Sequence, residues 1–428
     1  MGSIRAGVLP VVVLCLVLAG CAAPDTPSRP AASPVRSASP APPPVSEADL
    51  PAGVRYQEIS RRLESGRPVR LGVLSVAPDA RARVEAVHGA ALSRTETVRA
   101  QARRSGALFA VNGTYFDTGT GRDADGLDGD PIGLYAENGR VLSEALAGRP
   151  ALLLGRDRGR LDARITEVST VGRLRAADGA RRELDGVNRT AGRVPGCGGV
   201  GGDRLAVDGP AVTRPSKGVC TDTDEVVYFT EQWGRTTPAG PVGSTEVLLA
   251  ADGTALRTRT PAGGPLPEGG RSLYGIGEGA AWLRSHVRPD TRAAVSMRIT
   301  DPSGQPLAGA VRSALGGSAR LLSGGDIDPD ARRLGPDREP RTVAGVASDG
   351  TLLLVAIDGR APGESVGATP TEAARLARSF GAVDAVNLDG GGSTTVVLEG
   401  RLRNSPRGSE KGNVTERRVA NAIAILSP

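Results

Sequence analysis

Residues 352–388 restrict the fold of this chain more than any other segment. Two apolar runs, Leu352 to Ile357 and Val383 to Leu388, flank a stretch with helical character. Thr369-Pro370-Thr371-Glu372 is a capping box with proline at the first helical position, and Gly381 suits a left-handed helix end. The segment therefore predicts a strand, a helix and a second, parallel strand joined by a right-handed crossover.

Polar groups follow both predicted strands. Asp358-Gly359-Arg360 comes after the first strand, and Asp389-Gly390-Gly391-Gly392-Ser393-Thr394 comes after the second. Because ligands of open α/β sheets collect beyond the carboxyl ends of parallel strands, we expect the two ends to share one site. Glycine leaves its N–H group uncovered, so Gly390 to Thr394 are expected to receive phosphate or sugar oxygens. A simple tight turn is the alternative for the glycines taken alone.

Strands outnumber helices in the rest of the chain. Apart from the helix after Thr369, one helix is expected at Thr95 to Arg104, while apolar or alternating runs bounded by turn residues predict strands. We expect an α+β or mixed α/β fold, strand-rich, with a mixed sheet and a βαβ unit near the C-terminus that carries the site. The further predicted strands are Val69–Ala77, Leu108–Val111, Ala151–Leu154, Val226–Thr230, Val247–Ala250, Ala293–Ile299, Thr394–Leu398 and Ala420–Leu426.

The first 50 residues predict export and membrane attachment. Residues 1–20 have the basic start, short apolar core and small-residue end of a signal peptide. Leu18-Ala19-Gly20-Cys21 is similar to the bacterial lipobox, which would make Cys21 a lipidated N-terminus. Residues 21–50, rich in Pro, Ala and Ser, would form an extended tether. The predicted location is the extracytoplasmic face of the cell membrane, with plain secretion as the alternative.

Cysteine usage agrees with an exported protein. Of the four cysteines, Cys15 lies in the predicted signal and Cys21 at the lipidation site. In an oxidising compartment the remaining two, Cys197 and Cys220, most simply form a disulfide. The formal net charge of +6 is spread as arginine and lacks basic blocks with interleaved aromatics. No nucleic-acid partner is therefore expected.

No cofactor is expected. Neither His88 nor His286 lies in a catalytic motif, and no zinc ligand set is present. One acidic loop is a weak calcium candidate, because Leu127 stands where the EF-hand spacing needs an oxygen ligand. A solvated loop is the favoured reading of its four carboxylates, Asp123, Asp125, Asp128 and Asp130.

Six ordered motifs resemble the phosphodiester glycosidase family. Together they cover most of the chain from about Leu108 to the C-terminus, whereas the residues before Leu108 carry no catalytic motif. The resemblance implies a glycosidase-like domain over residues 108–428, with residues 51–107 as an N-terminal strand and helix region packed on it. The motifs are Phe109–Asp117, Pro340–Gly345, Asp358–Arg360, Ser365–Gly367, Asn387–Thr394 and Glu416–Ala422.

The resemblance implies a hydrolase that cleaves a sugar from a phosphate, and the residue types suit this chemistry. A departing phosphate needs charge neutralisation, which the planar guanidinium group provides. Arg341, Arg360 and one of Arg417 and Arg418 are the candidates for this clamp. An oxocarbenium-like centre needs a carboxylate as nucleophile or base, for which Asp389 and Asp358 are best placed.

The predicted site also contains asparagines that could bind the sugar. Asn112, Asn387 and Asn421 are candidates to bind sugar hydroxyls, although asparagines also satisfy backbone groups in turns. The expected substrate is a carbohydrate phosphodiester in an envelope or extracellular glycan. Two alternatives remain: a glycan-binding or wall-organising lipoprotein without catalysis, and an ordinary O-glycosidase.

Overall fold

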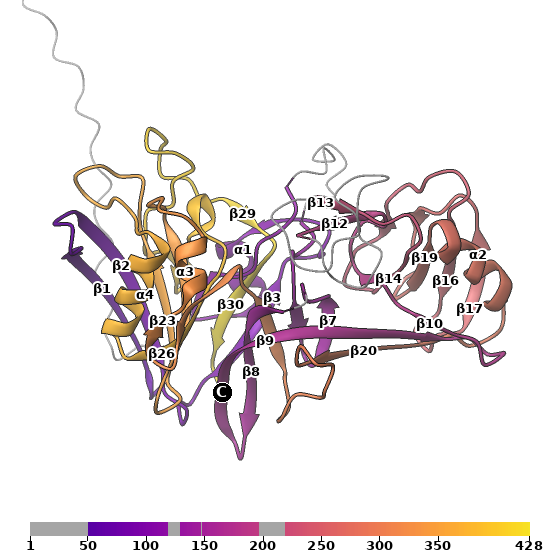
Figure 1. Cartoon of the computed structure of the whole chain (residues 1–428), viewed down its shortest axis with the longest axis horizontal. Helices are drawn as coiled ribbons and strands as arrows, with labels where there is room; N and C mark the ends of the chain where they lie inside the picture. Colours follow the sequence, from indigo (N-terminus) through magenta and orange to yellow (C-terminus); the bar gives the residue numbers. More distant parts are fainter. Residues whose placement is uncertain (1–49, 119–128, 147, 197–218) are drawn as a thin grey trace, which may run out of the picture. The chain divides into compact units, whose positions relative to one another are not determined.

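The strands around the predicted site belong to one seven-stranded sheet, called sheet A (Figure 1). The computed structural model describes residues 50–118, 129–146, 148–196 and 219–428. Described neighbours in sheet A pair antiparallel throughout. In spatial order its strands are β1 (Val54–Arg62), β2 (Pro68–Val76), β25 (Leu352–Ile357), β24 (Arg341–Ala347), β26 (Ala382–Asn387), β22 (Ala319–Ser323) and β23 (Asp326–Ile327).

Helix α4 (Pro370–Ser379) begins at the predicted capping box. The Thr369 hydroxyl accepts from the Glu372 N–H at 3.1 Å, and the Glu372 carboxylate accepts from the Thr369 N–H at 2.9 Å. The helix connects β25 to β26, which run in the same direction because each pairs antiparallel with β24.

The structure corrects the expected βαβ unit in one respect. β24 and β25 form a local hairpin across the turn at Gly350 (φ 87°), so β24 occupies the position between the two parallel strands. The chain must therefore cross over β24 before β26 can pair. The site lies at the edge of an antiparallel sheet, and the amino end of β24 adjoins the carboxyl ends of β25 and β26.

A second sheet, sheet B, packs face to face with sheet A. Its strands in order are β28 (Arg401–Leu402), β27 (Val396–Leu398), β5 (Phe109–Asn112), β30 (Asn421–Leu426) and β3 (Arg83–His88). Alternate residues such as Phe109 and Ile423 meet Leu354 and Val386 of sheet A in one apolar core. Helix α1 (Val98–Ser105) covers the other face of sheet B, and α4 with α3 (Pro329–Arg333) covers the other face of sheet A. Four layers result: helix, sheet, sheet and helix.

Two further sheets extend from this core. The long strand β9 belongs to one of them: its first half pairs with β8, and its second half pairs with β10 and β20. One sheet contains β10 (Arg181–Glu183), β9 (Arg160–Arg175), β8 (Arg149–Asp157), β21 (Ser313–Gly316), β6 (Tyr135–Glu137), β7 (Arg140–Ser143) and β20 (Ala294–Thr300). The other contains β11 (Gly186–Val187), β14 (Val226–Phe229), β19 (Arg271–Gly275), β16 (Thr245–Leu249) and β17 (Ala255–Arg259).

Helix α2 (Gly277–His286) packs on the last of these sheets through Leu283. That sheet is mixed, because β11 and β14 pair in parallel. Short ribbons complete the fold: β4 (Glu96–Thr97) with β29 (Arg418–Val419), β12 (Arg193–Pro195) with β13 (Val219–Thr221), and β15 (Thr236–Thr237) with β18 (Gly264–Pro265). No helix of the described residues is long and apolar enough to cross a membrane.

Candidate active site

Strand register brings the predicted acids and arginine to one edge of sheet A. Arg341 lies opposite Ile357, the residue before Asp358. Val343 lies opposite Asn387, two positions before Asp389. Both acids follow the carboxyl ends of strands, and the antiparallel β24 starts at the same edge. The structure therefore collects residues that lie almost 50 positions apart in the sequence.

Asp389 is held below the surface by backbone contacts. It is 8% exposed, its N–H donates to the Gly113 carbonyl at 3.1 Å, and its carbonyl accepts from Asn112 Nδ2 at 2.7 Å. The Gly390 N–H donates to its carboxylate Oδ1 at 2.9 Å. Burial raises the pKa of Asp389 to about 6, while the Ser393 hydroxyl, the charge of Arg417 and the Gly390 N–H act in the opposite direction.

Close backbone packing requires glycine in the loop that follows Asp389. A Cβ atom at Gly390 would lie 2.8 Å from the Pro340 carbonyl oxygen, and Gly391 has a φ of 59°. Residues Gly391–Ser393 form a 3₁₀ turn. The amides of Gly391, Ser393 and Thr394 donate to backbone carbonyls, and that of Gly390 donates to Asp389.

These bonds occupy most of the loop amides that were expected to receive phosphate oxygens. Four of the five amides from Gly390 to Thr394 already have acceptors within the chain, which leaves Gly392 among the described residues. The glycines instead let the loop turn closely against Pro340 and Arg360. The donors that stay available around the loop are therefore mainly side chains.

Arg341 is the side chain best suited to an anion. Its guanidinium group donates to the carbonyls of Ala368 (2.6 Å) and Asp337 (2.9 Å) and reaches Asn387 Oδ1 at 3.5 Å. Within the described residues no carboxylate oxygen lies within 4.0 Å of it, since the nearby Glu339 and Glu372 pair with Arg360 and Arg338. Burial lowers the pKa of Arg341, as expected for a cation without a countercharge.

Tyr115 is a further polar residue of this region, for which the motifs predicted no separate role. Asn387 Nδ2 donates to its hydroxyl at 2.8 Å, and Ser318 Oγ lies 3.3 Å away. Burial raises the pKa of Tyr115, the Asp389 charge raises it further, and Arg341 lowers it. The phenol therefore stays neutral and can donate a hydrogen bond at working pH. Its place in the motif Asn112-Gly113-Thr114-Tyr115 is the signal that could have identified it.

Arg417 lies beside the glycine loop, whereas Arg418 bonds elsewhere. The guanidinium of Arg417 lies over the Phe116 ring at 5.2 Å, and its Nη1 lies 3.4 Å from Ser393 Oγ. Arg418 is in β29 and donates to the Thr95 carbonyl. Arg417 precedes this strand, and the two neighbouring guanidinium groups therefore have different partners.

Arg360 and Asp358 hold neighbouring loops in place. Arg360 has a φ of 57°, pairs with Glu339 (2.7 Å) and donates to the carbonyls of Arg407 and Gly408. Asp358 accepts from Asn404 Nδ2 at 2.9 Å and from the Ser405 N–H at 3.2 Å, and burial raises its pKa. The Arg360 donors and the Asp358 acceptors are thus used in bonds to neighbouring loops.

Of the three predicted asparagines, two are buried in internal hydrogen bonds and one lies beside Tyr115 and Arg341. Asn112 is fully buried and accepts from the Thr342 hydroxyl (2.7 Å) and the Thr395 N–H (3.2 Å). Asn421 is also fully buried and binds the N–H and hydroxyl of Thr114. Both lie beneath the loop, and their amide oxygens and nitrogens are paired with groups of the protein. Only Asn387 reaches the reactive groups, through Tyr115 and Arg341.

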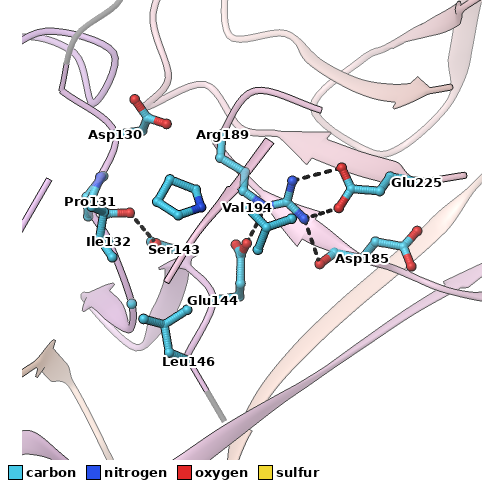
Figure 2. A pocket seen from close by; sticks show the side chains of 12 residues that line it. Asp130, Pro131, Ile132, Ser143, Glu144, Leu146, Asp185, Arg189, Val194 and Glu225 are labelled. Atoms are coloured by element: carbon cyan, nitrogen blue, oxygen red, sulfur yellow. Dashed lines mark hydrogen bonds and ion pairs between the residues drawn. The ribbon is translucent and has the colours of Figure 1, made fainter. Parts of the chain in front are cut away.

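A second polar cluster lies around Arg189, beside a small cavity of about 20 Å³ (Figure 2). The buried Arg189 pairs with Glu225 and Glu144 and donates to the Asp185 carbonyl. Burial raises the pKa of Asp185 to about 7, and the charge of Glu225 adds to this. The cluster ties residues 185–192 to β7 and β14 and shares no residue with the Asp389 site.

Metal and disulfide expectations are only partly covered by the described residues. No group of three or more His, Cys, Asp or Glu residues within them is arranged to hold a metal. Asp123, Asp125 and Asp128 of the acidic loop lie outside the described residues. Cys220 is fully buried and disulfide-bonded, whereas its predicted partner Cys197 lies outside the described residues.

Comparison with known proteins finds a family match that includes several of the candidate site residues. Residues 245–426 match the family model described as phosphodiester glycosidase. Over 90 residues the chain is 36% identical to the mouse N-acetylglucosamine-1-phosphodiester alpha-N-acetylglucosaminidase, a match covering 21% of this chain and 17% of that protein. An uncharacterised prophage-derived protein of Bacillus subtilis is 35% identical over 91 residues, or 13% of its length. The chain thus spans less than a fifth of the curated relatives it matches.

Two solved structures share the fold over most of the chain. One, from Burkholderia pseudomallei and described as an exported protein, is 31% identical with a TM-score of 0.74, and the match covers 84% of this chain and 74% of that one. The other, a hypothetical protein from Synechocystis, is 20% identical with a TM-score of 0.64 over 88% and 62% of the two chains. Arg341, Asp389 and Arg417 lie inside the family match, whereas Tyr115 lies before it.

Proposed function

Because the chain belongs to the phosphodiester glycosidase family through residues 245–426, we propose that it is a hydrolase of glycosyl phosphodiester bonds. One observation carries the proposal. A buried carboxylate, Asp389, and a partly buried guanidinium, Arg341, both act on the Tyr115 hydroxyl through their charges, and Asn387 bonds to both Tyr115 and Arg341. No described carboxylate pairs with that guanidinium. This combination provides a base or nucleophile beside a place for an anion.

Each group has a role in the proposed reaction. Arg341 and Arg417 neutralise the phosphate monoester as it departs from C1 of the sugar, since guanidinium groups bind phosphate oxygens in a planar fork. Asp389, ionised above pH 6, attacks C1 or activates water. The neutral Tyr115 hydroxyl donates a hydrogen bond, and Asn387 orients both Tyr115 and Arg341. Every step uses side chains of this chain.

We further propose an extracytoplasmic, lipid-anchored enzyme that acts on an envelope or extracellular glycan. The lipobox-like sequence ending at Cys21 and the Pro-rich tether to residue 50 support this location. The similarity to a protein described as exported also supports it. A disulfide between Cys197 and Cys220 would suit the same compartment.

Hydrolysis can be tested with a defined substrate. The methyl phosphodiester of N-acetylglucosamine 1-phosphate is incubated with the purified chain, and released sugar is measured by chromatography. We expect turnover that falls at least about 100-fold in Asp389→Asn, the scale of a lost acid–base group. Asp326→Asn, at an exposed acid on β23 of the same sheet, should keep full activity as the matched control.

Two results would overturn the proposal. One is an absence of turnover for phosphodiesters of several sugars; calorimetric binding without cleavage would then identify the non-catalytic glycan-binding lipoprotein. The other is equal cleavage of a phosphate-free aryl glycoside of the same sugar, which would favour an ordinary O-glycosidase.

A further inference from the structure

A strip of arginines lies on the exposed face of the ribbon formed by β9, β10 and β20. Side chains directly opposite in an antiparallel pair share a face. The register places Arg175 opposite Arg181 and Ala294, and Arg173 opposite Glu183 and Ser296. The exposed side chains of this face therefore comprise Arg173, Arg175, Arg181, Arg298, Glu183, Ala294 and Ser296.

These arginines lack the partners that surface arginines usually have. Among the described residues no carboxylate lies within 4.0 Å of the guanidinium groups of Arg173, Arg175, Arg181 or Arg298. Glu183 is opposite Arg173 in register without forming an ion pair at that distance. Arg182 points to the other face, where it pairs with Asp185 at 3.7 Å.

The arrangement is unfavourable for the chain alone. Like charges directly opposite on neighbouring strands destabilise a sheet, and Arg175 faces Arg181 in this way. Short side chains at Ala294 and Ser296 leave space beside the arginines, so a groove of about 460 Å³ opens over the three strands. An adjoining hollow of about 430 Å³ shares Arg173 and continues past Arg298 to Thr300.

We propose that this groove binds an anionic phosphodiester polymer, with the phosphates placed along the arginine strip. Guanidinium groups favour phosphate, and the groove extends along the strands as a linear chain requires. The second half of β9 carries the strip, whereas the carbonyl of Ile165 in its first half accepts from Arg320 beside β26. From Ile165 to Arg173 a strand extends about 26 Å. The groove is therefore separate from the Asp389 site and can retain a long polymer.

The binding test uses the full chain carrying Asp389→Asn, so that hydrolysis is absent and the result does not depend on the proposed function. Fluorescence anisotropy measures binding of labelled poly(glycerol phosphate). We expect the triple variant Arg173→Gln/Arg175→Gln/Arg181→Gln to bind at least 10-fold more weakly. The matched control, Arg67→Gln/Arg257→Gln/Arg401→Gln, removes the same charge from exposed arginines elsewhere and should change binding less than 2-fold.

A second variant and a salt series strengthen the test. Ala294→Glu keeps every arginine but places a carboxylate in the groove, so binding should weaken without loss of the fold. Three phosphate contacts predict a slope of about −2 for log K against log salt, at about −0.7 per contact as in single-stranded polyanions.

Each remaining outcome would overturn the inference. Equal losses in the groove and control variants would mean that net charge alone attracts the polymer. Tighter binding of oligothymidylate, or binding of phosphatidylglycerol vesicles in place of the polymer, would assign the strip to a nucleic acid or a membrane. An absence of polymer binding by the chain would end the proposal.

Discussion

Asp389 and Arg341 owe their properties to burial. A carboxylate in a turn normally ionises near pH 4, yet the pKa of Asp389 is raised to about 6 because the loop and Gly113 exclude water from it. Arg341 is buried against carbonyls, which satisfy its N–H groups without cancelling its charge. At this scale the site consists of one proton-sensitive acid and one cation prepared for an anion.

The pH–rate profile should report Asp389. If the ionised carboxylate is the reactive form, kcat/KM rises with pH, with a midpoint at about 6, and levels off above it. The Asp389→Asn variant should show no such rise in its residual activity. A flat wild-type profile between about pH 5 and 7, or a fall through that range, would exclude Asp389 as the ionised base or nucleophile.

Arg341→Lys should separate phosphate recognition from general stability. Lysine keeps the charge but loses the planar fork, so we expect kcat/KM for the phosphodiester to fall by about 10- to 100-fold, equivalent to roughly 1.5–3 kcal/mol. Arg332→Lys, at an exposed position of α3, is the control and should be neutral. Equal loss for a phosphate-free glycoside in Arg341→Lys would show that Arg341 does not read the phosphate.

At the scale of elements, the site is a set of loops clamped to strand ends. Asn404 shows how: it donates to the Asp358 carboxylate and to the Thr394 carbonyl, both at 2.9 Å, and accepts from the Val396 N–H at 2.8 Å. One side chain thus joins the end of β25, the glycine loop and the start of β27. Arg360 performs a parallel function for Arg407 and Gly408.

Asn404→Ala should loosen this clamp. Removal of its side chain leaves the Val396 N–H without its acceptor and the Asp358 carboxylate with the Ser405 N–H but without the Asn404 donor, at a cost of about 1–3 kcal/mol in the free energy of unfolding. Chemical denaturation would measure the loss. Asn413→Ala, at an exposed position in the following loop, should change stability by less than about 0.5 kcal/mol. Equal stability of the two variants would show that Asn404 is not a clamp.

At the scale of the whole molecule, distant parts of the chain complete each other's sheets. β2 pairs with β25, and β3 pairs with β30, so residues 54–88 are integral to the two central sheets and do not form a separate layer packed on them. The Arg189 cluster likewise joins three segments through Glu144, Asp185 and Glu225. Interactions of this kind make the stability of the fold depend on pH.

Asp185 should make stability fall as pH rises. Its pKa in the folded state is about 7, above the ordinary value of 3.8, so between these values the folded state binds more protons than the unfolded state. The free energy of unfolding therefore decreases from about pH 4 to pH 8, by an amount on the order of 4 kcal/mol. Asp185→Asn should be more stable than the wild type at pH 8 and should lose most of this slope. An unchanged slope in denaturation experiments at several pH values would contradict the assignment.

The sequence by itself determined the elements whose signals are local. The capping box fixed the start of α4, Gly381 adopts the predicted left-handed conformation, and the apolar runs at β25 and β26 lie within one residue of their observed bounds. These features depend on neighbouring residues only. The motifs also indicated the family, because short ordered segments keep their spacing along the chain.

Only the tertiary structure decided what each site residue does. It inserted β24 between two parallel strands, turned Arg417 toward Ser393 and Arg418 away, and paired Asn112, Asn421 and Asp358 with loop atoms. It also brought Tyr115 to Asn387 and within the influence of the Asp389 and Arg341 charges. The physical reason is common to all of these results. Strand register and the partners of buried hydrogen-bonding groups depend on segments that meet only in the folded chain. No periodic pattern in the sequence predicts them.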